Sequence, residues 1–199
     1  MSENGQPSNA SLFVISGPSG VGKGTLCRLL LQSLSLPLSL SVSATTRAMR
    51  PGEADGVDYH FKTREAFEAM INQPGALLEW AEYNGQYYGT PRAAIEERLQ
   101  NNFSVLLEIE TQGAMKIREY RESGLLPQTR LIFIEPPSVE ILEQRLRGRM
   151  TNSDEDIERR LLIARQELAL SGEFDHVIVN DALESAYQQL LALIAGHLS

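Results

Sequence analysis

The sequence has a single cysteine and no long apolar run. Cys27 has no second cysteine to pair with, which excludes an internal disulfide and a cysteine metal cluster. No uninterrupted apolar stretch approaches the length that spans a bilayer, and residues 1–10 lack the basic start and apolar region of a secretory signal. We therefore expect no membrane partner, a cytoplasmic location, a disordered tail over residues 1–10, and a buried, inert Cys27.

Lysine is also scarce, and the net charge is negative. Only three of the 18 basic residues are lysines, and the formal charge is −8, which argues against nonspecific binding to nucleic acid. The arginines gather near residues 47–50 and 145–160. Because the planar guanidinium forms bidentate contacts with phosphate, this pattern favours a phosphate-bearing small molecule as the ligand.

Strands and helices alternate along the 199 residues, which predicts an α/β fold with a mainly parallel sheet covered by helices on both faces. The core is expected over residues 11–43 and 91–199. Its strands are predicted at 12–15, 38–43, 105–110, 131–134 and 177–179. Residues 44–90 form a small β-rich insertion with a strand at 57–61, a helix after Thr63 and a hairpin of 77–83 with 86–88 around Asn84-Gly85.

Five helix starts are predicted from capping patterns, the first of them at Thr63. Thr90-Pro91 offers a capping hydroxyl followed by a proline at the first helical position. Ser138 opens a helix to Arg147, while Ser153 with Asp156 opens a long helix ending near Gly172, and Asp181 with Glu184 precedes the C-terminal helix.

A glycine-rich turn follows the first apolar strand. Gly17, four further residues, Gly22 and Lys23 match most of the phosphate-binding loop pattern, in which backbone N–H groups surround a polyphosphate. Lys23 can then reach the β- and γ-phosphates. The pattern has a hydroxyl directly after the lysine, whereas this chain has Gly24 and then Thr25. The hydroxyl that ligates Mg²⁺ in this pattern is thus displaced by one position to Thr25, which is the candidate metal ligand; the kinases that this chain resembles, named below, can hold Mg²⁺ largely through phosphates and water.

Residue types that bind phosphates and bases occur close together in the insertion. Arg47 and Arg50 stand three residues apart, tyrosine hydroxyls are available at Tyr59 and Tyr88, and Glu79 precedes the only tryptophan. Ordinary roles compete with these: Arg145 and Arg147 can pair with Glu140 or Glu143 at helical spacing, and only one of Tyr87 and Tyr88 can face a site, because strand side chains alternate.

The chain resembles the guanylate kinases. The resemblance rests on the segments SGPSGVGKGT, SVSATTRAMRPGE, GVDYHF, LLEWAEYNGQYYGT, LEIETQG, FIEPPS, LRGR and VIVND, in family order from Leu12 to the C-terminal helix. It implies a P-loop kinase core, a GMP-binding insertion at residues 44–90, a helical lid at about 138–170, and magnesium-dependent phosphoryl transfer from ATP to GMP, giving ADP and GDP.

The resemblance also implies the roles of individual residues. It assigns ATP binding to Gly17, Pro18, Ser19, Gly20, Val21, Gly22, Lys23, Gly24, Thr25 and Asn180. It assigns the GMP phosphate to Arg47, Arg50, Tyr59 and Tyr88, and the guanine to Ser43, Glu79, Thr90 and Glu110. It assigns catalysis to Lys23, Arg47, Arg145, Arg149 and Arg160.

Glu79 is suited to guanine, because a carboxylate accepts hydrogen bonds from N1–H and from the N2 amino group, whereas adenine offers an acceptor at N1 and has no N2 amino group. Serine and threonine hydroxyls can donate to O6. Family members often carry aspartate at the position of Glu110 and serine at that of Thr90. Glu108, two residues before Glu110 on the same strand face, can assist Mg²⁺ through water.

Two other functions fit parts of the pattern. The Gly-Lys-Gly-Thr spelling alone allows another nucleoside monophosphate kinase, although Glu79 counts against it. A catalytically silent, guanylate-kinase-like interaction module is the second alternative, in which a usable phosphate loop would be superfluous. A homo-oligomer is possible in either case.

Overall fold

The computed structural model describes residues 10–33, 38–83, 85–126, 128–148 and 153–198. Its main sheet has five strands in the order β2-β7-β1-β8-β9, all paired in parallel. The strands are β1 (Leu12–Ser16), β2 (Leu38–Leu40), β7 (Ser104–Glu108), β8 (Thr129–Glu135) and β9 (His176–Val179). The predicted α/β core with its parallel sheet is confirmed.

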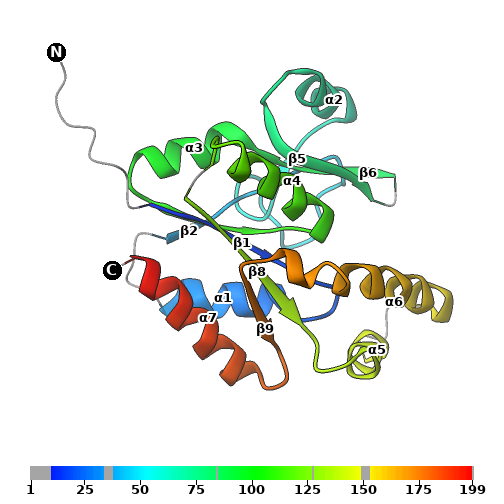
Figure 1. Ribbon diagram of the computed structural model, residues 1–199. Coiled ribbons are helices and arrows are strands. Elements are labelled where there is room, and N and C mark those ends of the chain that lie inside the picture. The colour runs from blue at the N-terminus through cyan, green and yellow to red at the C-terminus, as the bar shows by residue number, and fades with distance from the viewer. Residues whose placement is uncertain (1–9, 34–37, 84, 127, 149–152, 199) are drawn as a thin grey trace, which may run out of the picture.

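Helices cover both faces of the main sheet (Figure 1). Alternate residues of β1 point to opposite faces: Leu12 and Val14 pack toward α3 (Arg92–Gln100) and α4 (Thr111–Glu122). Phe13 and Ile15 pack toward α1 (Lys23–Ser33) and α7 (Leu183–Leu198). Burial on both faces explains the unbroken apolar sequence of β1, since neither face meets solvent.

The predicted insertion contains a second sheet of four strands in the order β4-β3-β6-β5. Its strands are β3 (Ala44–Thr45), β4 (His60–Phe61), β5 (Leu77–Tyr83) and β6 (Gln86–Pro91), and α2 (Arg64–Asn72) packs against it. Phe67 of α2 is fully buried in this small core and stacks on Tyr87. In Figure 1, β5, β6 and α2 lie beside α3 and α4, away from α1 and α7.

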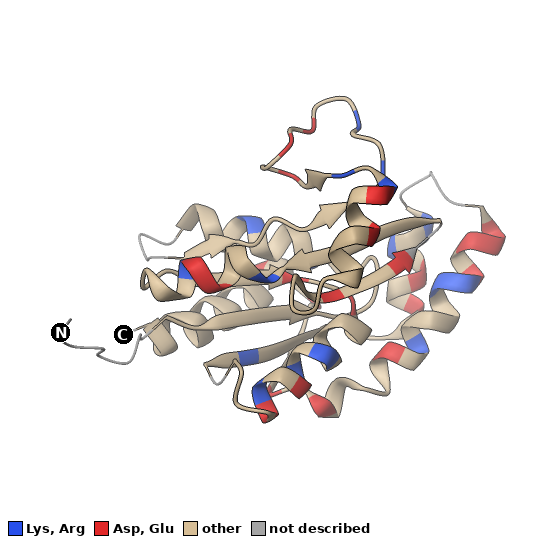
Figure 2. Cartoon of the chain, turned by 90° about the horizontal axis from the view of Figure 1, so that it is seen from above, with Lys and Arg blue, Asp and Glu red and all other residues tan. Residues whose placement is uncertain are grey.

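Two helices, α5 (Val139–Arg147) and α6 (Asp154–Leu168), project from the carboxyl edge of the main sheet (Figure 1). They share a small core that includes Leu142, Leu146 and Ala164. The first turn of α6 is acidic, and basic residues follow further along the helix (Figure 2). A short 3-10 helix, η1 (Ser171–Glu173), leads from α6 to β9.

The element boundaries differ from the predictions at several points. The strand predicted at 38–43 ends at Leu40, and that at 57–61 shortens to His60–Phe61. The predicted strand 105–110 ends at Glu108, and α6 ends at Leu168, four residues before Gly172. The pairing partners set these limits: β2 finds only Ser104, Val105 and Leu106 on β7, and β4 finds only two residues on β3.

Three capping predictions are confirmed, and the prediction for Thr90 is not. Thr63, Ser138 and Ser153 cap their helices, each accepting a backbone N–H from the third residue on. The prediction for Thr90 was wrong: α3 begins at Arg92 with Pro91 as its N-cap, and the Thr90 hydroxyl donates to Glu79 instead. A buried carboxylate is the stronger acceptor, since hydrogen bonds to ionised groups exceed those to neutral ones.

Cys27 is buried in the core between α1 and the sheet, as predicted, and its burial raises the pKa of the thiol. Within the described part of the chain, no helix is long and apolar enough to cross a membrane. The predicted tail falls mostly on residues 1–9, which are outside the described residues, while Ala10 is buried.

Candidate active site

The phosphate-loop residues lie between the end of β1 and the start of α1. Gly17 has φ 140° and Gly22 has φ 104°, both in the region that favours glycine. A Cβ atom on Gly17 would lie 2.2 Å from the Ile134 carbonyl oxygen, so a side chain cannot fit there. The sequence therefore forms a loop whose backbone passes directly against β8, with the positive end of α1 behind it.

Lys23 lies over this loop. Its ammonium group donates to the carbonyl oxygens of Gly17, at 2.5 Å, and Pro18, at 3.3 Å, and the residue is only 8% exposed. A phosphate oxygen can replace these carbonyl oxygens as the acceptor of hydrogen bonds from the Lys23 ammonium group. The position fits the predicted role of Lys23 as a cation beside a bound phosphate.

Glu108 stands beside Gly24 at the end of β7. A Cβ atom on Gly24 would be 3.4 Å from Glu108 Oε2. Gly24, which stands where the loop pattern has a serine or threonine, therefore lies beside a carboxylate. Burial raises the pKa of Glu108, while the charge of Lys23 lowers it. Thr25 is exposed. The described residues contain no group of three or more His, Cys, Asp or Glu side chains that could hold a metal.

Arginines from α5 and α6 approach the same loop. Arg160 Nη1 donates to the Ser19 hydroxyl at 3.3 Å. Among the described residues, the buried Arg160 Nε finds no hydrogen-bond partner, so one donor is left for a ligand. Arg145 donates to the carbonyl oxygens of Asn180 and Asp181, rather than pairing with Glu140 or Glu143. Arg149 lies outside the described residues.

Arg147 and Asn180 have local partners. Arg147 pairs with Glu143 and Asp154, which agrees with the ordinary role expected from its helical spacing. The Asn180 side chain is buried and donates to the Val21 carbonyl at 2.7 Å, so it holds the phosphate loop from the end of β9. This contact is with the loop itself, and the sequence offered no sign of it.

The second sheet brings Arg47, Tyr59 and Tyr88 together. The Arg47 guanidinium carbon is 5.3 Å from the centre of the Tyr59 ring, and the two tyrosine rings are 6.1 Å apart in an edge-to-face arrangement. The hydrogen bonds to Glu53 and the charge of that carboxylate raise the pKa of Arg47. Tyr87 points the other way, toward Phe67 and Trp80, as alternation along the strand predicts.

Glu53 is a partner that the sequence analysis missed. Arg47 donates to both oxygens of its carboxylate, at 3.0 and 2.8 Å, and the Arg50 backbone N–H donates to it at 2.8 Å. The pair fixes the plane of the Arg47 guanidinium. The Arg50 side chain is exposed, and Ser43 is half-buried at the entrance to β3.

Glu79 lies on β5 with its carboxylate against the first turns of α4. Thr90 donates to its Oε1 at 2.5 Å, and a Cβ atom on Gly113 would come within 2.9 Å of its Oε2. Burial raises the pKa of Glu79, whereas the Thr90 hydrogen bond and the charge of Lys116 lower it. The glycine at position 113 therefore leaves the space that the Glu79 carboxylate occupies.

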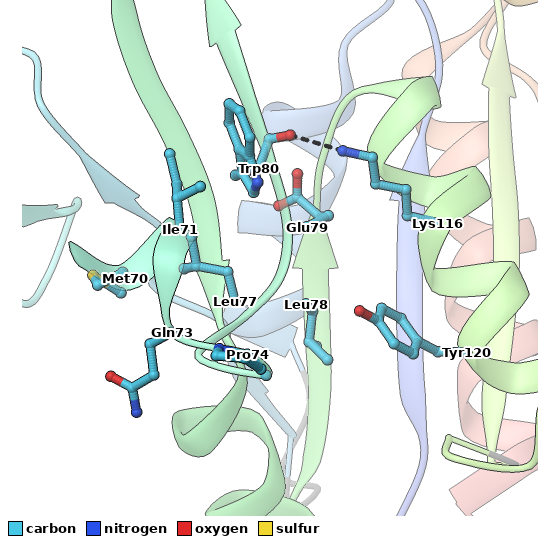
Figure 3. A pocket seen from close by; sticks show the side chains of 11 residues that line it. Met70, Ile71, Gln73, Pro74, Leu77, Leu78, Glu79, Trp80, Lys116 and Tyr120 are labelled. Atoms are coloured by element: carbon cyan, nitrogen blue, oxygen red, sulfur yellow. Dashed lines mark hydrogen bonds between the residues drawn. The ribbon is translucent and has the colours of Figure 1, made fainter. Parts of the chain in front are cut away.

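A cleft beside Glu79 is lined by residues of β5, α4 and the end of α2 (Figure 3). Lys116 donates to the Trp80 carbonyl at 3.0 Å, and Tyr120 lies one turn along α4. This contact covers part of the outer edge of β5. Glu110, the N-cap residue of α4, is exposed, and its charge raises the pKa of Glu79.

The geometry thus provides a phosphate loop with a buried lysine, a cleft lined in part by a buried carboxylate, and a cluster in which an arginine lies over the first of two touching tyrosine rings. A sequence model of the guanylate kinase family matches residues 9–196. The chain belongs to the guanylate kinase family. The guanylate kinase from Synechocystis sp. is 51% identical over 183 residues, covering 92% of each chain.

Further guanylate kinases are similarly close. That of Parasynechococcus marenigrum is 52% identical over 184 residues, covering 92% of this chain and 97% of the relative. That of Streptococcus pneumoniae is 48% identical over 183 residues, covering 92% and 85%. The crystal structure of guanylate kinase from Anaplasma phagocytophilum has a TM-score of 0.72 and 32% identity, covering 95% of this chain and 86% of that one. The resemblance noted in the sequence is confirmed.

Proposed function

We propose that this protein transfers the γ-phosphoryl group of ATP to GMP, giving ADP and GDP. The observation that carries the proposal is the buried Glu79 carboxylate, held by Thr90 on a sheet that also brings together Arg47, Tyr59 and Tyr88. A base-reading acid and a phosphate-binding cluster on one small sheet suit a nucleoside monophosphate. The family membership supports the same reaction.

The guanine is read by the Glu79 carboxylate, which accepts hydrogen bonds from N1–H and the N2 amino group. Thr90 directs its own proton to Glu79 in this structure, so its role is to orient the carboxylate. Ser43 and Glu110 are the further guanine contacts proposed. An adenine would leave Glu79 facing an acceptor at N1, and an unpaired buried carboxylate is costly.

Two phosphate sites are then needed. Arg47, Arg50, Tyr59 and Tyr88 bind the GMP phosphate, and residues 17–25 with Lys23 bind the ATP phosphates. The helices α5 and α6 act as a lid that carries Arg145 and Arg160 toward the transferring group, and Arg149 is proposed for the same role. Since phosphoryl transfer depends on in-line positioning and charge neutralisation, these cations supply most of what the reaction needs.

The residues present fit a bound Mg²⁺. The Glu108 carboxylate and the Thr25 hydroxyl are oxygen donors beside the phosphate loop, and Mg²⁺ usually keeps several waters and binds one or two carboxylates plus substrate phosphates. When bound, the ion neutralises charge on the β- and γ-phosphates. The cytoplasmic location, the homo-oligomer and the absence of nucleic acid and membrane partners stay predictions.

The reaction is tested by measuring ADP production with GMP, AMP, UMP and IMP as acceptors. We expect GMP to be preferred, and a preference for AMP or UMP would contradict the assignment of Glu79. Lys23→Ala should abolish turnover while retaining the thermal unfolding transition, and Lys62→Ala, at an exposed lysine, is the matched control. Unchanged turnover in Lys23→Ala would refute its role, and a chain without any turnover would favour the interaction module.

A further inference from the structure

Asn180 is a buried polar residue at the carboxyl end of β9. It is 5% exposed, and its backbone N–H donates to the Glu135 carbonyl at 2.7 Å, which continues the pairing of β9 with β8. A buried amide side chain without hydrogen-bond partners costs free energy, so it takes its partners from the protein or from a ligand. The partners of Asn180 therefore indicate what the residue does.

The partner of the Asn180 side chain is the phosphate loop. Its Nδ2 donates to the Val21 carbonyl oxygen at 2.7 Å, in a buried contact between residues 159 positions apart. A Cβ atom on Gly22 would lie 2.6 Å from the same Nδ2, so the loop backbone passes directly against the amide. Gly22 has φ 104° and no side chain, which makes this close approach possible.

The Val21 carbonyl and the Gly22 N–H belong to one peptide unit. Because a trans peptide is planar, its C=O and N–H point in opposite directions. The hydrogen bond from Asn180 holds the carbonyl on the side of β9 and so turns the Gly22 N–H away from β9. In a phosphate loop the backbone N–H groups are the donors to the phosphates, so the orientation of this peptide unit affects how well a triphosphate fits.

Arg145 contacts the backbone of Asn180. Its Nη2 donates to the Asn180 carbonyl at 2.9 Å and to the Asp181 carbonyl at 3.4 Å. The next residue of α5, Leu146, lies against the loop itself, since a Cβ atom on Gly20 would be 2.8 Å from its Cδ2. The end of α5, the end of β9 and the phosphate loop are therefore in direct contact, and Asn180 joins all three.

We infer that Asn180 is a positioning residue for the triphosphate: its side chain holds the Val21–Gly22 peptide unit, and it acts on ATP through the phosphate loop without reading the adenine. The inference rests on the proposed function, because the loop is assigned to the ATP phosphates there. The resemblance places Asn180 among the ATP-binding residues, and the contact with Val21 specifies which part of ATP it serves. A side chain that is 5% exposed and bound to the loop has little surface left for a base.

The first test compares ATP with inosine triphosphate as the phosphoryl donor. In inosine triphosphate a carbonyl oxygen replaces the amino group of adenine at C6, while the triphosphate is the same. Asn180→Ala should lower kcat/KM about tenfold for both donors, because the lost contact does not involve the base, and KM for GMP should stay within about twofold. A loss confined to ATP, or no loss with either donor, would overturn the inference.

Asn101→Ala is the matched control. Asn101 Nδ2 donates to the Glu97 carbonyl at 2.8 Å, so this variant removes the same kind of hydrogen bond from an exposed position at the end of α3. It should use both donors as wild type does. Thermal unfolding of both variants shows how much stability each has lost. Equal losses of kcat/KM in Asn101→Ala and Asn180→Ala would indicate a general weakening of the fold and would contradict the inference.

Inorganic triphosphate, which has no base, provides a measurement without turnover. Calorimetric titration in the presence of Mg²⁺ and without GMP should give a Kd about tenfold higher for Asn180→Ala than for wild type, because only the fit of the loop has changed. Asn101→Ala should leave this Kd unchanged. A wild-type Kd for Asn180→Ala would show that the side chain does not serve the triphosphate, whatever acceptor the enzyme uses.

Amide hydrogen exchange in the ligand-free protein tests the contact apart from the proposed reaction. The Val21 N–H donates to the Pro18 carbonyl at 3.2 Å, so its exchange reports opening of the loop beside Asn180. Exchange should be about tenfold faster in Asn180→Ala and in Asn180→Asp, which has the same shape but places a carboxylate oxygen against the Val21 carbonyl. Unchanged exchange in both variants would refute the inference, whereas faster exchange would support the contact even if GMP were not the acceptor.

Discussion

Gly113→Ala should damage GMP recognition without damaging the fold. In the interior of a helix, replacing glycine by alanine normally stabilises by about 0.5–1 kcal/mol, and Gly113, in the first turn of α4, is expected to gain only part of this. Here the new Cβ would stand 2.9 Å from Glu79 Oε2, 3.2 Å from Cδ and 3.3 Å from Cγ. The contact at 2.9 Å cannot persist, so the Glu79 side chain has to move.

The displaced atom is the end of a flexible side chain, so the cost to stability is small, and it offsets the gain in helix propensity. The free energy of unfolding is therefore expected to stay within about 1 kcal/mol of wild type. GMP binding is expected to weaken, because the displaced carboxylate no longer accepts well-aligned hydrogen bonds from N1–H and the N2 amino group. Losing about 1.5 kcal/mol from a charge-assisted hydrogen bond corresponds to roughly a tenfold higher KM for GMP.

The assay combines urea unfolding with steady-state kinetics at saturating ATP. Gly196→Ala is the matched control, because Gly196 also lies in a helix, α7, and a Cβ atom there meets nothing within 4 Å. It should gain stability with unchanged KM for GMP. An unchanged KM in Gly113→Ala, or a loss of stability greater than about 3 kcal/mol, would refute the reasoning about Glu79.

Three further predictions concern stability and reactivity. Because burial raises the pKa of Glu167 from its ordinary 4.5 to about 7, its contribution to the free energy of unfolding is fully present below about pH 4.5 and is lost as pH rises through 7. This contribution is at most about 3.4 kcal/mol, and about 2 kcal/mol after solvent screening. Urea unfolding of wild type from pH 5 to 8 should show the fall in the free energy of unfolding. An equal pH dependence in Glu167→Gln would contradict the assignment to Glu167. Phe67→Ala should cost about 3–5 kcal/mol, measured by thermal unfolding, and a loss below 1 kcal/mol would show that the second sheet does not depend on this ring. Cys27 should not react with a thiol reagent until the protein is denatured, since burial raises its pKa, and rapid labelling of native protein would contradict its burial.

The protonation state of Glu167 affects stability. The fold is more stable with the carboxyl protonated than with it ionised. At neutral pH the protein therefore holds a buried charge at some cost to stability. Unpaired or partly paired charges of this kind concentrate at functional sites, where environment shifts a pKa toward neutrality.

The sequence by itself determined the class of fold and the local units of the site. The apolar run of β1, the glycines at 17 and 22 and the lysine at 23 define a strand, loop and helix from local rules alone, since backbone φ preferences and hydrophobic pattern act over a few residues. The caps at Thr63, Ser138 and Ser153 were predictable for the same reason.

Only the tertiary structure decided which partners the side chains take. Thr90 is predicted to cap a helix, but its hydroxyl donates to Glu79 on β5. The Asn180 side chain donates to the Val21 carbonyl of the phosphate loop. Both carboxylate oxygens of Glu53 accept hydrogen bonds from Arg47. Ser16 and Thr111 are 95 positions apart in sequence, and their hydroxyl groups form a buried hydrogen bond. Local propensity says nothing about such contacts, because burial and the choice among competing donors are fixed only when strands and helices pack together.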